Sequence, residues 1–139
     1  MIEHVWSILC SASIIDSNSN NVSLINVVEQ LTLSPDASFP LEIMIGLEIV
    51  TLWILSDPDQ PAKGKSRLVF VNPSGEESEL GQAEIDLTSF IRFRQTARIQ
   101  GLPLKEPGRH IFRVEYANDA DGDTQVVANI PLDIFIASE

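Results

Sequence analysis

Apolar and polar residues alternate along much of the chain, and clusters of Asn, Asp, Gly and Pro interrupt the alternation. A repeat of two residues is typical of strands with one buried face, and no long segment keeps a helical repeat. The pattern predicts about eight strands, over residues 4–15, 22–33, 41–55, 65–71, 78–85, 91–100, 109–117 and 124–136. We therefore expect an all-β protein, an antiparallel β-sandwich that is immunoglobulin-like or C2-like in architecture.

Turn-forming residues predict where these strands are connected. Residues 16–21 are rich in Asn, Asp and Ser, and residues 72–75 place a glycine where a positive φ is easily adopted. Successive antiparallel strands place alternate loops at opposite ends of a domain. The loops at 16–21, 56–64, 86–90 and 118–123 are therefore expected to share one end.

Length and composition indicate one globular domain, residues 1–139, with 44% hydrophobic and 21% charged residues. Cys10 is the only cysteine, so no internal disulfide can form, which favours a reducing compartment. The first residues lack the basic and apolar pattern of a secretory signal. We expect a cytoplasmic protein.

The net charge of −11 is distributed unevenly. Residues 1–62 hold eight acids and no lysine or arginine, residues 63–113 hold nine bases and six acids, and the remainder holds six acids. An acidic surface repels phosphate backbones, so no nucleic-acid binding is expected. The most apolar segment, residues 41–55, contains Glu42 and Glu48 and is too short for a membrane span.

The stretch NDADGDTQ, residues 118–125, raises the possibility of a calcium site. It lacks the glycine and glutamate that an EF-hand loop requires at 124 and 130. A C2-type site would instead combine aspartates of two loops, namely Asp57, Asp59, Asp119, Asp121 and Asp123. The alternative is that Asp, Asn and Gly only form tight turns, in which case no cofactor is bound.

Arg92, Arg94 and Arg98 alternate with apolar residues, so they are expected on one face of their strand. Such a basic stripe suits a phosphate or an acidic partner. The alternative is cross-strand pairing with acids such as Glu77, Glu79 or Glu115.

Residues 50–55 are apolar on both faces, and a strand of this kind needs cover on both sides. If Val50, Leu52 and Ile54 are not covered by a loop such as residues 34–40, they are expected to form a subunit interface.

Candidate catalytic residues are few. Cys10 has only His4 and His110 as possible bases, and His110 is expected at the edge of the core with a satisfied hydrogen bond. No nucleophile elbow, phosphate-binding loop or zinc motif occurs in the sequence. We therefore expect no catalytic residues and no enzyme activity.

Three stretches, NNVSLINVVEQLTL, VNPSGEE and LPLKEPGRHIFRVEYAND, resemble a family of uncharacterised bacterial β-sandwich proteins, a domain of unknown function. The resemblance spans most of the chain and implies a fold but no activity. The first functional hypothesis is a non-enzymatic protein-interaction or structural module, an oligomer or an accessory subunit, with a protein partner or a second copy bound. The alternative is a calcium-dependent ligand-binding module.

Overall fold

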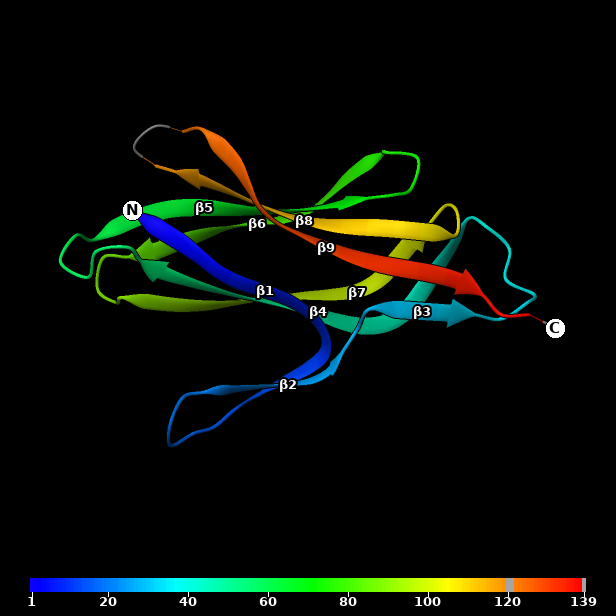
Figure 1. Ribbon diagram of the computed structural model, residues 1–139, viewed down its shortest axis with the longest axis horizontal. Coiled ribbons are helices and arrows are strands. Elements are labelled where there is room, and N and C mark those ends of the chain that lie inside the picture. The colour runs from blue at the N-terminus through cyan, green and yellow to red at the C-terminus, as the bar shows by residue number, and fades with distance from the viewer. Residues whose placement is uncertain (120–121, 139) are drawn as a thin grey trace.

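The computed structural model describes residues 1–119 and 122–138, and the regular elements in them are β-strands (Figure 1). These residues form nine strands: β1 (Ile2–Ile15), β2 (Val22–Val27), β3 (Gln30–Leu33), β4 (Leu41–Leu55), β5 (Ala62–Val71), β6 (Glu77–Leu87), β7 (Arg92–Leu104), β8 (Gly108–Asn118) and β9 (Thr124–Ile136). The predicted all-β class is confirmed. No helix that could cross a membrane occurs in the described part of the chain.

The strands form two sheets that pack face to face. One sheet has four strands in the order β2-β1-β4-β7, and the other has five in the order β3-β9-β8-β5-β6. The pairs are antiparallel except for β3 and β9, which are parallel. The edge strands β6 and β7 belong to different sheets but contact each other, so both sheets end on the same side of the molecule.

The core lies between the two sheets, where the inward-facing side chains of the long strands are buried or half-buried. Trp53 of β4 and Phe112 of β8 are among the largest fully buried side chains, and each sheet also contributes leucine and isoleucine. Burying one such side chain contributes about 1.5–3 kcal/mol. The alternation in the sequence thus determines which face of each sheet turns inward.

The first strand pairs with two neighbours in turn. β1 pairs with β4 from Ile2 to Cys10 and with β2 from Cys10 to Ile15. The resulting β1–β2 hairpin projects from the body of the molecule in Figure 1. Two hydrogen bonds tie it to the outer face of the four-stranded sheet: Ser13 Oγ donates to Glu48 Oε1 (2.7 Å), and Arg94 Nη2 donates to the carbonyl of Asn20 (3.1 Å).

The prediction of one strand over residues 22–33 is wrong. The structure has β2 and β3 there, in different sheets, with Val28 and Glu29 between them. Asn26, one residue before the end of β2, has a φ of 55°, which is unusual for a residue other than glycine and marks an irregular backbone close to the point where the chain passes to the other sheet. The apolar pattern continues across this break, so periodicity alone could not locate it. The described residues therefore hold nine strands rather than eight.

Three of the four loops expected at one end, those at 56–64, 86–90 and 118–123, lie together there for the described residues. The backbone N–H of Ser56 donates to Met1, that of Leu55 to Ile91, and that of Asp119 to Lys63. Figure 1 shows the β4–β5 and β6–β7 connections beside the N-terminus at this end. A second prediction needs correction, because the expected loop at residues 101–108 is largely strand, with β7 continuing to Leu104.

Candidate functional site

The residues predicted to bind calcium are Asp57, Asp59, Asp119, Asp121 and Asp123, and Asp121 lies outside the described residues. Asp57 Oδ1 accepts a hydrogen bond from the backbone N–H of Asp59 (3.0 Å), which is the contact of a tight turn. Within residues 1–119 and 122–138, no three His, Cys, Asp or Glu side chains are grouped to hold a metal ion. Calcium binding stays a prediction.

The residues predicted to form a subunit interface are Val50, Leu52 and Ile54 of β4. Val50 is fully buried by the chain itself, so it offers no surface to another subunit. Leu52 and Ile54 are half-buried, and Leu52 lines a surface hollow together with Trp6, its partner on β1, and Val22 of the β1–β2 hairpin. The hairpin therefore supplies cover that we expected from residues 34–40 or from a second copy. A subunit contact through Leu52 and Ile54 stays a prediction.

The three arginines of β7 share the outer face of the four-stranded sheet, as their alternation predicts. Arg92, Arg94 and Arg98 lie opposite Ile54, Leu52 and Glu48 of β4. Arg98 Nε is 3.6 Å from Glu48 Oε2, a loose and exposed ion pair. No carboxylate of the described residues forms an ion pair with Arg92 or Arg94.

The glutamates suggested as partners of these arginines lie on the other sheet. Glu115 is buried there, and its carboxylate accepts hydrogen bonds from Arg67 (2.9 Å) and Arg113 (2.8 Å). Arg67 also pairs with Glu79, and Arg113 also pairs with Glu77, both at 2.5 Å. We call these five residues the glutamate–arginine network. The suggested pairing with β7 is therefore wrong, because β6 and β8 both pair with β5.

Hydrogen bonds in this network shift the pKa values of its members. The Arg113 guanidinium lowers the pKa of Glu77. The pKa of Glu79 is lowered first by Gln82 and then by Arg67. Hydrogen bonds to glutamates raise the pKa values of Arg67 and Arg113, so all four groups are held in their charged forms.

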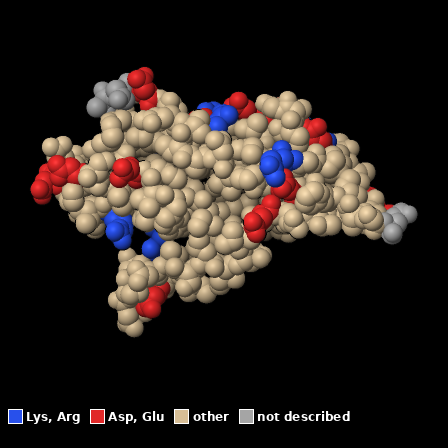
Figure 2. Space-filling view, viewed as in Figure 1, with Lys and Arg blue, Asp and Glu red and all other residues tan. Residues whose placement is uncertain are grey.

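Arg92 and Arg94 border an open hollow of about 670 Å³ between the hairpin tip and the four-stranded sheet. We call it the basic-aromatic groove and define it by the residues Trp6, Asn20, Leu52, Phe90, Arg92 and Arg94. Figure 2 shows basic atoms beside a hollow between a projecting lobe and the body. Phe90 is 70% exposed. Phe90 was not predicted as a site residue from the sequence, although an aromatic residue that ends a turn-forming segment is an unusual signal.

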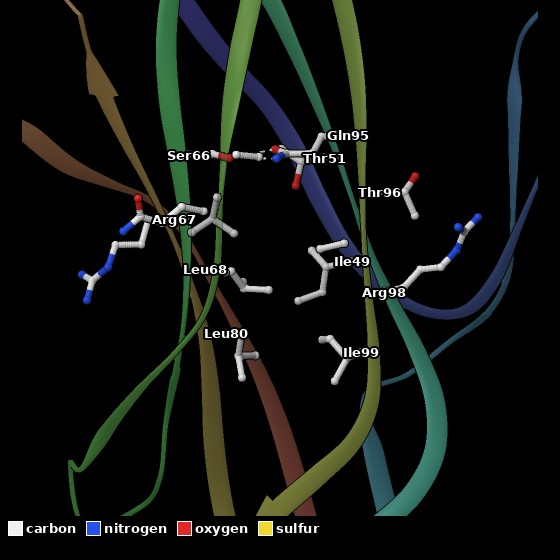
Figure 3. A pocket seen from close by; sticks show the side chains of 15 residues that line it. Ile49, Thr51, Ser66, Arg67, Leu68, Leu80, Gln95, Thr96, Arg98 and Ile99 are labelled. Carbon is white, nitrogen blue, oxygen red and sulfur yellow. Dashed lines mark hydrogen bonds between the residues drawn. The ribbon is translucent and has the colours of Figure 1, made fainter.

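A second hollow of about 290 Å³, the inter-sheet cavity, lies between β6 and β7 where the two sheets end (Figure 3). Its walls include Ile49, Leu80 and Ile99. At one end Gln95 accepts a hydrogen bond from Trp53 Nε1 (3.0 Å) and donates one to Ser66 Oγ (2.8 Å). These polar side chains satisfy one another, so the cavity presents a mainly apolar surface.

The three candidates for nucleophilic chemistry all take part in packing. Burial, followed by the charge of Glu48, raises the pKa of the Cys10 thiol. His4 Nε2 hydrogen-bonds with Ser7 Oγ (2.8 Å). His110 is fully buried rather than at the core edge, and its ring stacks on Phe70 with centroids 5.2 Å apart. Burial lowers the pKa of both histidines.

Comparison with known proteins supports the fold only. No family model matches the chain, and no curated protein matches it. Two solved structures of a β-glucosidase from Listeria innocua are similar, with TM-scores of 0.51 for the enzyme and 0.50 for its complex with glucose. Each is 11% identical to this chain in sequence. The match covers 99% of this chain but only 16% of the β-glucosidase chain. The chain thus spans a small part of these proteins, and at this identity the likeness shows the fold alone.

Proposed function

We propose that the chain is a non-enzymatic protein-interaction module that binds an acidic segment of a partner protein at the basic-aromatic groove. The observation that carries the proposal is the pair Arg92 and Arg94, which form no ion pair with a carboxylate of the described residues. The protein has 20 acidic residues against nine Lys and Arg, so intramolecular partners are abundant elsewhere. Two carboxylates of a bound segment would neutralise this pair.

The residue types of the groove support a protein partner. Arginine and aromatic side chains are enriched at the centres of protein interfaces, where they contribute most of the binding energy. Trp6 is half-buried and Phe90 is exposed, so together they offer apolar contact area beside the two guanidinium groups. Guanidinium groups also bind carboxylates through two parallel hydrogen bonds, which fixes the geometry of the contact.

The scaffold suits this role. We propose that the two sheets form a β-sandwich of immunoglobulin-like or C2-like architecture, from the bacterial family that the sequence resembles, acting as an accessory subunit. Loops and hairpins that a rigid sheet supports are frequent binding sites. For the alternative, calcium-dependent binding, the described residues contain no group of three side chains that could hold the ion.

The proposal is tested by fluorescence anisotropy with a labelled peptide that contains glutamate and leucine. Wild-type protein is expected to bind the peptide, and the variant Arg92→Glu with Arg94→Glu is expected to bind at least about tenfold more weakly. The matched control is Lys63→Glu with Lys65→Glu, which makes the same change of charge at exposed residues of β5. Equal binding by the arginine variant and the control would reject the proposal.

A further inference from the structure

The strand that carries the arginines has an unpaired edge. β7 is 13 residues long and pairs with β4 alone among the strands of the described residues. An unpaired strand edge presents a row of backbone N–H and C=O groups that another strand can bind. Because β7 lies at the end of its sheet, the basic stripe and this free edge belong to the same element.

The hydrogen-bonding pattern shows which backbone groups face the free edge. The backbone N–H of Leu55 donates to the carbonyl of Ile91 (3.0 Å), so these two residues form a hydrogen-bonded pair. The register continues without a shift from Ile54 opposite Arg92 to Leu47 opposite Ile99. In an antiparallel ladder the bonded residues alternate, so odd-numbered residues of β7 bond to β4. The N–H and C=O groups of Arg92, Arg94 and Arg98 therefore point away from β4.

The two faces of β7 differ in chemistry along this edge. Figure 3 shows Arg98 and Thr96 directed away from the inter-sheet cavity, while Ile99 is directed into it, opposite Leu80 of β6. Ala97 and Ile99 line the cavity from β7. A strand placed beside β7 would meet arginines on its outer face and an apolar cavity mouth on its inner face.

We infer that the partner segment adds to the free edge of β7 as an antiparallel strand in which acidic and apolar residues alternate. This inference rests on the proposed function and specifies the conformation of the partner. Partner residues that exchange hydrogen bonds with Arg92, Arg94 and Arg98 carry their side chains on the same outer face, directly opposite the guanidinium groups. Acidic side chains fit there, and the residues between them place apolar side chains over the inter-sheet cavity.

The test uses a short peptide that alternates glutamate and valine, with backbone N-methyl groups at the glutamates or at the valines. In the inferred pairing the glutamate N–H groups donate to β7 and the valine N–H groups point to solvent. Methylation at the glutamates is therefore expected to weaken binding at least about tenfold. Methylation at the valines is the matched control and is expected to leave the affinity close to that of the parent peptide.

The other possible results distinguish a failure of strand addition from a failure of the proposed function. If both methylated peptides bind like the parent while Arg92→Glu with Arg94→Glu still prevents binding, strand addition is wrong and the proposed function stands. If the parent peptide does not bind wild-type protein at all, the proposed function fails as well, and the arginines only guard the edge against pairing. A dimer in sedimentation experiments that Arg92→Glu with Arg94→Glu dissociates and the peptide does not would indicate a second copy at the edge, and would overturn the inference.

Discussion

The outer faces of the two sheets both carry arginines, but they use them differently. On the five-stranded sheet, Arg67 and Arg113 are held by three glutamates, and the central one, Glu115, is buried. On the four-stranded sheet, Arg92 and Arg94 form no ion pair with a carboxylate of the described residues. The same residue type therefore forms an ion-pair network on one face and, in our proposal, binds an acidic ligand on the other.

The difference has a physical origin in strand pairing. β5 lies between β6 and β8, so its Arg67 has glutamates from both neighbours within reach. Among the described strands β7 pairs only with β4, and β4 places Ile54 and Leu52 opposite Arg92 and Arg94. The edge strand thus leaves Arg92 and Arg94 without an ion-paired carboxylate among the described residues, and we propose that a partner protein supplies carboxylates there.

The largest effect is expected from Glu115→Ala. Removal of the buried carboxylate leaves Arg67 and Arg113 without their shared acceptor, so the free energy of unfolding should fall by about 2 kcal/mol. Urea denaturation measures this change. Glu84→Ala, at an exposed residue of β6 in the same sheet, is the control and should change stability by less than about 0.5 kcal/mol. Equal effects of the two substitutions would contradict a structural role for the network.

The second-largest effect is expected from substitution of one arginine on the outer face of each sheet. Arg92→Gln should weaken binding of the acidic peptide about tenfold while stability changes by less than about 0.5 kcal/mol. Arg113→Gln should lower stability and leave the peptide affinity unchanged. Anisotropy and denaturation of both variants check this expectation. The contrast between the faces fails if both substitutions act on the same property.

A smaller effect is expected from Phe90→Ala, which removes an exposed ring of the basic-aromatic groove. Loss of its contact area should weaken peptide binding about fivefold and leave stability nearly unchanged. Phe135→Ala is the matched control, because Phe135 is 48% exposed and belongs to β9 of the other sheet. A loss of affinity in the control as large as in Phe90→Ala would place the binding surface elsewhere.

The smallest effect is the pH dependence of the glutamate–arginine network. The pKa values of Glu77 and Glu79 are lowered in the folded protein, so their contribution to stability is present above pH 4.5, the ordinary value, and is lost as the pH falls through the folded values. Glu77→Gln with Glu79→Gln should therefore flatten the acid side of the stability profile. Denaturation at a series of pH values measures it, and identical profiles would reject the linkage.

Periodicity predicted the faces of the strands but not their neighbours. The alternation around Arg94 correctly places the arginines outside and Ile99 inside, because side-chain direction depends on the strand repeat alone. Whether Glu79 meets Arg67 or Arg94 depends on strand order, which no local pattern encodes. The cover of Leu52 by the β1–β2 hairpin was missed for a related reason, since it requires β1 to change partners near Cys10.

The most direct test of the contrast between the two faces is a titration of isotope-labelled protein with the acidic peptide, followed through the arginine Nε–H signals in NMR spectra. The signals of Arg92 and Arg94 are expected to shift progressively as the peptide is added, whereas those of Arg67 and Arg113 stay in place. Shifts confined to Arg67 and Arg113, or no shift of any of the four signals, would contradict the account.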